Sequence, residues 1–318
     1  MSEKKHNHDN KKNQNILIIS FAIIFVFMLI EVVSGVVTNS LALLSDAGHM
    51  LSDAVSMLVA IIAFSYGAKK ATESKTYGYK RFEVLAALFN GLSLVAISVI
   101  IVIEAIERFQ NPSKIISYGM LAISILGLLV NVVMMLIMMK KADVENNINM
   151  KGAYLHVIGD ALGSVGAIIA SLCIIFFDWT IADPIMSILI AVIITKSGIG
   201  LIKDSIHILM ESKPNHIETE AIKKELLKYE NVHNINDLHI WTITSNVHAL
   251  TVKLQIEEMD VIHYKRLLHQ IEHDLEHLGI SHCTIQLDFD KETKPLYCDL
   301  KMIESDDGHG HGHHHHHH

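Results

Sequence analysis

The chain has 318 residues, of which 50% are hydrophobic and 19% are charged, and its mean hydropathy is positive. Several apolar runs are about as long as a bilayer is thick, which excludes an ordinary water-soluble globular protein. The formal net charge is −8 and no cluster of Lys and Arg forms a basic surface, so the composition argues against a nucleic-acid-binding protein.

The first 15 residues are polar and rich in Lys and Asn. They predict a cytosolic N-terminal tail that is disordered and carries no cleavable signal. Six apolar segments follow, each about the twenty residues that a membrane-spanning helix needs. They cover residues 16–37, 41–68, 82–106, 115–139, 153–177 and 181–202. We therefore expect a six-helix transmembrane domain over residues 16–206.

Basic residues gather in the connections after the second and fourth apolar segments, around Lys80 and Lys140. The first and fifth connections contain no Lys or Arg. By the positive-inside rule, both termini lie in the cytoplasm and the protein is a multi-pass protein of the cell membrane. The third connection fits this rule less well, because it contains Arg108 and Lys114.

After the sixth apolar segment the chain becomes a mixed α and β sequence, which predicts a small cytoplasmic domain over residues 207–290. Its elements have the order αββαβ. The predicted helices and strands cover residues 217–229, 232–244, 247–256, 261–278 and 283–289. Residues 291–318 form a C-terminal tail, whose last six histidines are typical of a purification tag.

The second and fifth apolar segments carry the same pattern of polar residues, His49-x-x-x-Asp53 and His156-x-x-x-Asp160. Residues four apart lie on one face of a helix, so two such helices that face each other present two imidazoles and two carboxylates to one point. A carboxylate inside a membrane costs about 3 kcal/mol on insertion scales, which a bound cation can offset. The duplicated pattern therefore predicts a tetrahedral site for a divalent metal ion.

Two further features accompany these ligands. Asp46 lies on the same helix face as His49; it could orient that imidazole or help a proton leave, and a role at the start of the helix is equally consistent with its position. Three glycines of the fifth segment, Gly159, Gly163 and Gly166, are expected to let a neighbouring helix approach closely. The other interpretation of the whole pattern is a polar seam that holds helices together.

Mixed nitrogen and oxygen ligands favour zinc, cobalt or cadmium over magnesium or calcium, which prefer oxygen ligands alone. Two carboxylates neutralise the charge of a divalent ion, and two neutral imidazoles complete the four ligands. Histidine must lose its proton before it binds a metal, so the metal ion and the proton compete for the same nitrogen atom. This competition predicts an exchange of metal ions for protons.

At these residues the chain resembles the zinc-exporting branch of the cation diffusion facilitator family. The resemblance also includes Tyr-Gly-Tyr-Lys-Arg-Phe-Glu at residues 77–83 and Leu-His-Ile-Trp at residues 238–241. It implies a homodimer that exchanges cytosolic zinc for external protons, with a ferredoxin-like cytoplasmic domain at the dimer interface. It also implies that zinc is the transported substrate and that no cofactor is needed. Family members with Asp in place of His49 tend toward manganese or iron.

A second metal site, in the cytoplasmic domain, is less clearly indicated. Animal relatives use histidines at positions where this chain has other residues, namely Asn236, Lys253 and Ser281. Asp288 can still bind a metal, and His239 and His282 belong to the neighbouring predicted strands. These three residues are the candidate ligands of a cytoplasmic site, and the absence of such a site is the alternative.

Three classes of function fit a buried metal site in a membrane protein. The first is a proton-coupled antiporter that exports zinc, cobalt or cadmium. The second is a membrane metalloenzyme, but such enzymes keep an open coordination position with a base beside it, whereas four protein ligands close the shell here. The third is a metal sensor, which binds the ion and signals without carrying it across the membrane. A measurement of ion flux separates the first class from the other two.

Overall fold

The computed structural model describes residues 2–37, 41–110, 117–245, 247–289 and 296–297. The chain forms two compact units. The first comprises residues 1–210 together with 243–246, and the second comprises residues 211–242 together with 247–318. The first unit is helical and the second contains a sheet, so each is considered separately.

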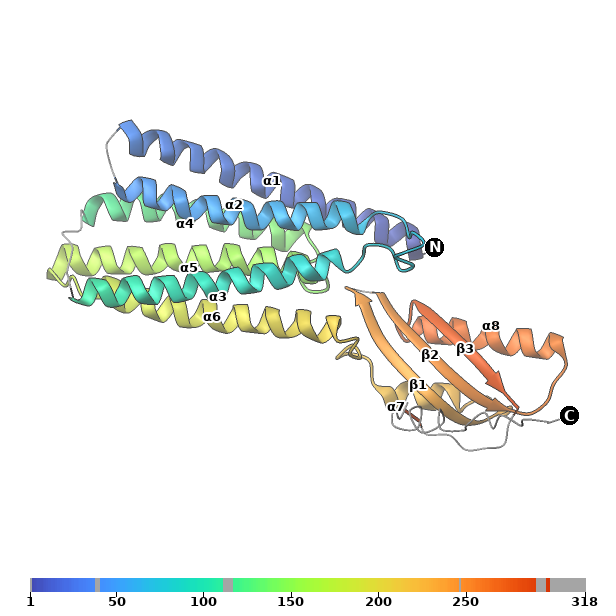
Figure 1. Ribbon diagram of the computed structural model, residues 1–318. Coiled ribbons are helices and arrows are strands. Elements are labelled where there is room, and N and C mark those ends of the chain that lie inside the picture. The colour runs from blue at the N-terminus through green and yellow to red at the C-terminus, as the bar shows by residue number, and fades with distance from the viewer. Residues whose placement is uncertain (1, 38–40, 111–116, 246, 290–295, 298–318) are drawn as a thin grey trace, which may run out of the picture. The chain divides into compact units, whose positions relative to one another are not determined.

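The first unit contains the long apolar helices (Figure 1). They are α1 (Ser2–Val37), α2 (Leu41–Gly67), α3 (Phe82–Gln110), α4 (Ser117–Lys141), α5 (Ile148–Phe177) and α6 (Ala182–Leu209). Five of them are long and apolar enough to cross a membrane, and in α2 the described residues contribute the shorter apolar stretch Asp53–Gly67. The predicted polytopic helical membrane domain is confirmed.

Helix α1 begins at Ser2, so the expectation of a disordered tail before residue 16 is wrong. No proline or glycine interrupts the chain before the apolar residues, and a helix that has already nucleated extends at little cost. Two side chains near this junction hold the helix in the bundle. The amide of Gln14 donates to the Ser65 hydroxyl at 2.7 Å, and Oδ1 of Asn13 accepts from the backbone N–H of Asp143 at 3.0 Å.

Helix α5 begins at Ile148, earlier than the predicted start at residue 153. The cause is a local cap: Oδ1 of Asn147 accepts from the backbone N–H of Met150 at 2.9 Å, which satisfies one of the free donors of the first turn. The helix ends at Asp178, whose left-handed backbone (φ 54°) lets its N–H bond back to the last turn. These two ends fix which residues of α5 face the interior.

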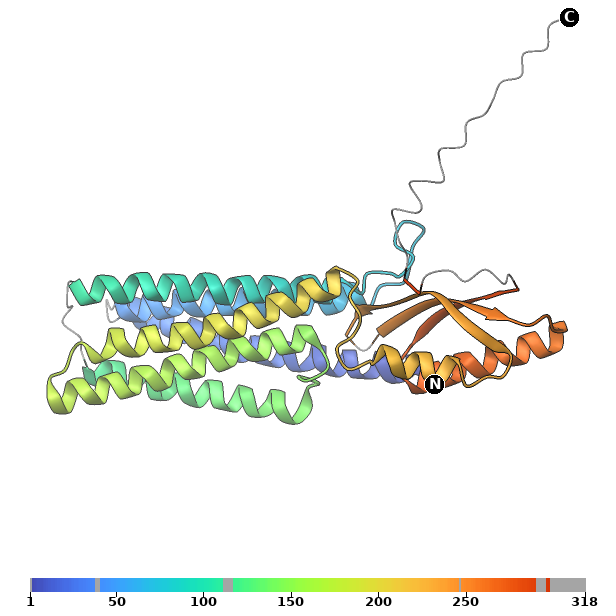
Figure 2. The same cartoon turned by 90° about the horizontal axis from the view of Figure 1, so that it is seen from below.

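Helices α3 and α6 form a close pair that packs against α5 (Figure 2). A Cβ atom added at Gly198 would lie 3.0 Å from the backbone oxygen of Gly91, so only glycines allow this approach. The other helices, α1, α2, α4 and α5, share a separate apolar core that includes Leu17, Met57 and Met134. Helix α5 therefore lies between the two groups and contacts both.

The second unit consists of α7 (Thr219–Leu226), β1 (Val232–Thr244), β2 (Val247–Ile256), α8 (Val261–His277) and β3 (His282–Asp288). The strands form one sheet in the order β1-β2-β3, and β2 and β3 run parallel with Val252 opposite Ile285. A parallel pair needs a crossover connection, which α8 provides. The predicted αββαβ order is confirmed.

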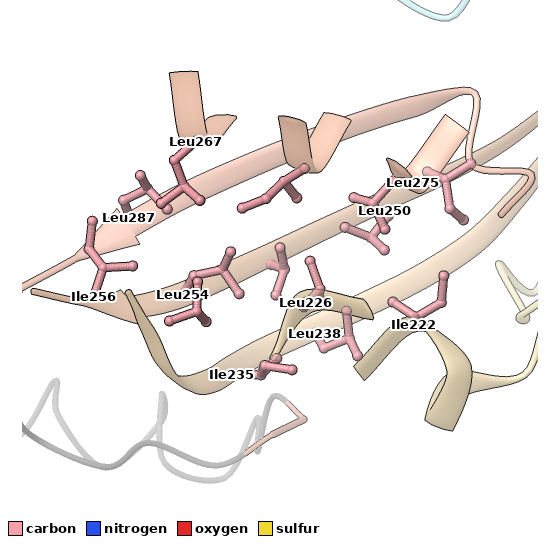
Figure 3. Close-up of a cluster of buried hydrophobic side chains, with 14 of the residues drawn as sticks. Ile222, Leu226, Ile235, Leu238, Leu250, Leu254, Ile256, Leu267, Leu275 and Leu287 are labelled. Atoms are coloured by element: carbon pink, nitrogen blue, oxygen red, sulfur yellow. The ribbon is translucent and has the colours of Figure 1, made fainter. Parts of the chain in front are cut away.

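The core of this unit lies between the sheet and its two helices (Figure 3). Every second residue of β2 from Leu250 to Ile256 is buried, as the alternating sequence predicted. Ile222 and Leu226 of α7 and Leu275 of α8 cover these side chains. The unit therefore has a complete hydrophobic core of its own.

Candidate metal centre in the membrane domain

The helix pair α2 and α5 brings three of the predicted ligands together. Asp53 comes from α2, and His156 and Asp160 lie one turn apart on α5. One ligand atom from each of these side chains lies within 4.8 Å of the other two, a spacing that a single metal ion can bridge. Among the side chains that the structure describes, this is the one group of His, Cys, Asp and Glu with such geometry.

The contact at the centre of this group joins an imidazole to a carboxylate. Nε2 of His156 lies 2.6 Å from Oδ1 of Asp53, and the two side chains are only 2% and 4% exposed. A hydrogen bond between these atoms needs one proton, held by either partner. Because both atoms are removed from water, the pair is stable only while a proton or another cation occupies the space between them.

The other two predicted residues of this region, His49 and Asp46, belong to α2. Their side chains lie outside the described part of the structure. The backbone places His49 one helical turn from Asp53, as the i, i+4 spacing predicted. The structure therefore brings together Asp53, His156 and Asp160, and leaves the participation of His49 as a prediction.

A cavity of about 240 Å³ contains all three described ligands in its wall. The residues that line the cavity run along α5 from His156 to Ala167 and along α3 from Leu94 to Ile101. The cavity therefore extends toward the end of the bundle where α5 ends and α6 begins. We call this the α5–α6 end. On the other side of the ligands the helices touch: a Cβ atom at Gly152 would lie 3.2 Å from Leu201 and 3.4 Å from Asn90. The cavity therefore extends from the ligands toward the α5–α6 end.

Gly159, Gly163 and Gly166 of α5 have different roles, which corrects the expectation that all three allow a neighbouring helix to approach. Gly166 meets α6 closely, because an added Cβ would lie 2.1 Å from a methyl carbon of Ile190. Gly159 makes ordinary contact with Ile194, at 3.5 Å. Gly163 has nothing within 4 Å and instead forms part of the cavity wall.

A second cavity, of about 160 Å³, adjoins the first at the α5–α6 end. Its polar wall contains Arg108 and Glu104 of α3 and Asp183 of α6. Sequence reasoning did not single out Asp183. The available signal was indirect: Arg108 departs from the positive-inside rule, and a buried acidic partner explains how it is tolerated there.

Comparison with known proteins follows the same division of the chain. The family described as Cation efflux transmembrane domain matches residues 17–210, and the family described as Cation efflux protein, cytoplasmic domain matches residues 214–289. The chain belongs to the cation efflux family. This is the cation diffusion facilitator family, in its zinc-exporting branch, so the resemblance seen in the sequence is confirmed.

Three relatives show the range of this similarity. The cadmium, cobalt and zinc/H(+)-K(+) antiporter of Bacillus subtilis is 50% identical over 307 residues, which cover 96% of this chain and 99% of the relative. The zinc transporter ZitB of Escherichia coli is 38% identical over 291 residues, covering 89% and 92%. The cation efflux system protein CzcD of an Alcaligenes species is 36% identical over 285 residues, covering 89% of each chain.

Membership of the cation efflux family makes this chain a multi-pass membrane transporter and not an enzyme, so the metalloenzyme interpretation is excluded. The metal ion is accordingly a transported substrate and not a cofactor.

In the cytoplasmic domain the structure does not bring the three candidate ligands together. His282 and Asp288 are the two ends of β3, which places them about 20 Å apart at the rise of a strand. His239 instead pairs with Asp237, with Nε2 2.9 Å from Oδ1. The ammonium of Lys253 lies 2.7 Å from the other oxygen of Asp237. Hydrogen bonds from Lys253 and then from His239 lower the pKa of Asp237.

Proposed function

We propose that this cation efflux protein exports zinc from the cytoplasm in exchange for protons, through a site formed by His49, Asp53, His156 and Asp160. The observation that carries the proposal is the buried group of Asp53, His156 and Asp160 in the wall of a cavity that opens toward one end of the bundle. His49 completes the set because it lies one turn from Asp53 on the same helix face.

The ligand chemistry supports zinc as the substrate. Two carboxylates neutralise a divalent ion, and two imidazoles supply the nitrogen ligands that zinc prefers over magnesium and calcium. Cobalt and cadmium satisfy the same ligands. The Bacillus subtilis relative is named for cadmium, cobalt and zinc, and the Escherichia coli relative for zinc.

Exchange for protons follows from the contact between Asp53 and His156. These two atoms hold one proton between them when they hydrogen-bond at 2.6 Å. A metal ion that binds Nε2 of His156 removes the proton from that atom; an imidazolium then releases one proton and keeps the other on Nδ1, and departure of the metal lets the released proton return. Helix movements that open the site alternately to each side of the membrane would turn this competition into antiport.

The same proposal includes the arrangement of the protein in the membrane. Basic residues at the connections after α2 and α4 support a cytoplasmic location for both termini. With this orientation, the α5–α6 end of the bundle faces the outside of the cell. The cytoplasmic domain, proposed as ferredoxin-like over residues 207–290, is the expected contact surface of a homodimer.

The test is zinc flux in proteoliposomes with an imposed pH gradient, using protein freed of its terminal histidines. Asp53→Asn and Asp160→Asn are expected to reduce zinc flux about 100-fold or more, since each removes a charged ligand. Ser164→Ala is the matched control, because Ser164 lines the same cavity one turn after Asp160. Its flux should stay within about twofold of the parent, since its hydroxyl is not a proposed ligand.

Three results would contradict the proposal or a part of it. Undiminished zinc flux in either aspartate variant would remove the site from the transport path. Zinc binding without any flux in the parent protein would favour the sensor interpretation. Zinc flux that does not respond to the pH gradient would reject proton coupling but would leave the zinc site in the transport path. Assays with and without potassium address the K(+) in the name of the Bacillus relative.

A further inference from the structure

An arginine is clamped between two carboxylates at the α5–α6 end of the membrane domain. Nη1 of Arg108 lies 2.6 Å from Oδ2 of Asp183, and Nη2 lies 2.5 Å from Oε1 of Glu104. The Asp183 side chain is 6% exposed, whereas those of Arg108 and Glu104 are 39% and 56% exposed. The guanidinium therefore bridges a buried carboxylate and an exposed one.

This ion pair lies on the route out of the metal site. The cavity beside it and the cavity that holds Asp53, His156 and Asp160 share four lining residues, Ile101, Gly163, Ala167 and Ile190. At the junction, Gly163 has no atom within 4 Å of where a side chain would begin. An ion that leaves the ligands toward the α5–α6 end reaches the Arg108 cluster next.

The cluster of Arg108, Glu104 and Asp183 affects how divalent cations bind in the outer cavity. Two carboxylates that face one cavity would attract a divalent ion, and the guanidinium occupies the position between them that such an ion would take. An arginine, like a lysine, is positively charged at physiological pH. The guanidinium therefore neutralises one of the two carboxylate charges and occupies the position between them, so the outer cavity does not present two free carboxylates to a divalent ion.

We propose that Arg108, positioned by Asp183, is an electrostatic gate that keeps external divalent cations from entering the cavity and binding at the metal site. With the guanidinium in place, an ion in the outer cavity meets a cluster of formal charge −1 instead of −2, and the space between the two carboxylates is already taken. This inference rests on the proposed function and its orientation. It means that the outer cavity favours release of the transported metal ion over its rebinding.

The same contacts could serve only to fasten α3 to α6, and a pair of variants separates the two roles. Arg108→Gln removes the positive charge and exposes both carboxylates. Asp183→Asn also breaks the ion pair but leaves the guanidinium charge in place. A fastening role predicts similar effects of the two variants, whereas a gate predicts that external metal binds more tightly in Arg108→Gln and not in Asp183→Asn.

The experiment measures inhibition of zinc efflux by zinc added on the external side, in proteoliposomes of fixed orientation. Arg108→Gln is expected to lower the half-inhibitory external zinc concentration about tenfold, the order expected for loss of one nearby charge. The KM for zinc on the cytoplasmic side should change less than about twofold. Asp183→Asn should leave external inhibition as weak as in the parent, and Arg108→Lys should restore the parental value.

Three outcomes overturn the gate. They are unchanged external inhibition in Arg108→Gln, equal shifts in Arg108→Gln and Asp183→Asn, and equal shifts of affinity on both sides of the membrane. Cobalt binding, followed by the absorption of tetrahedral Co²⁺, shows that each variant retains a folded site. If Asp53→Asn abolishes flux while Arg108→Gln leaves external inhibition unchanged, the gate is wrong and the proposed transport site stands. If Asp53→Asn transports normally, the transport site itself is wrong.

Discussion

The side chain of Asn147 joins two helices at once. Its Nδ2 donates to Oε2 of Glu83 at 3.1 Å, and its Oδ1 caps the first turn of α5 through the N–H of Met150. Both side chains are buried, with Glu83 2% and Asn147 4% exposed. The start of α3 is thereby tied to the start of α5, two turns before the proposed metal ligand His156.

Asn147→Ala is expected to lower the free energy of unfolding by about 2 to 4 kcal/mol, which combines a lost helix cap with a buried carboxylate left without its donor. The measurement is unfolding of the purified protein in detergent. Asn146→Ala is the control, because Asn146 is exposed and bonds only to Asp143 in its own turn. Equal stability of the two variants would show that the contact with Glu83 contributes little.

Gly198→Ala tests the close approach of α3 and α6. The new methyl group would lie 3.0 Å from the Gly91 oxygen and 3.2 Å from Leu94, so the helices must separate, at a cost of about 1 to 3 kcal/mol. Gly200→Ala, two residues further along the same helix, meets nothing within 4 Å. It should stabilise α6 by about 0.5 to 1 kcal/mol through helix propensity. The prediction is rejected if both variants change the unfolding midpoint in the same direction.

His248 predicts how the cytoplasmic domain responds to acid. Burial, and then the nearby charge of His216, lower the pKa of His248 to about 4. The ordinary pKa of histidine is 6.5. Below that pH the unfolded chain takes up a proton at His248, which the folded domain does not accept until about pH 4. The free energy of unfolding is therefore unaffected by this group above pH 6.5. It falls as the pH drops further, by about 2 kcal/mol between pH 7 and pH 5.

Hydrogen exchange of the β2 amides in the full-length protein measures this effect as an opening free energy at pH 5 and pH 7. In His248→Gln the difference between the two pH values should shrink by about 2 kcal/mol, because glutamine does not titrate. His269→Gln is the matched control, since His269 is an exposed histidine of α8. It should retain the parental pH dependence. A parental slope in His248→Gln would contradict the prediction.

His49→Asp tests the contribution of nitrogen ligands to metal selectivity. An oxygen ligand in this position suits manganese better than imidazole does, so the ratio of zinc to manganese transport should fall about tenfold or more. Met50→Leu, at the neighbouring residue in the cavity wall, keeps volume and polarity and should keep the parental ratio. Competition between the two ions in one flux assay gives the ratio directly. An unchanged ratio in His49→Asp would remove His49 from the proposed site.

The sequence predicted the membrane-spanning helices well because they depend on local patterns, and the predicted ligand group rests on local patterns too. Helix length follows from the length of each apolar run, and the spacing of His156 and Asp160 places them on one face whatever surrounds them. The alternating residues of β2 fixed its buried face in the same way. The Asn147 cap was also a local signal, and it explains why α5 begins earlier than its apolar run.

Contacts between distant residues could not be read in this way. Arg108 and Asp183 are 75 residues apart, and their pairing depends on how α3 and α6 cross. Gly163 and Gly166 belong to the same glycine-rich stretch, yet one lines a cavity and the other meets Ile190. Which of them faces a neighbour depends on the rotation of α5 in the bundle, which local sequence does not specify.

One helix, α5, holds the Asn147 cap, the ligands His156 and Asp160, and the open position at Gly163. Each added residue in an α-helix turns everything beyond it by about 100°. A single insertion or deletion between the cap and His156 would therefore rotate both ligands and the cavity wall away from their partners together. We expect homologous sequences to vary freely in side chains along the outward faces of α5 while conserving the number of residues between these positions.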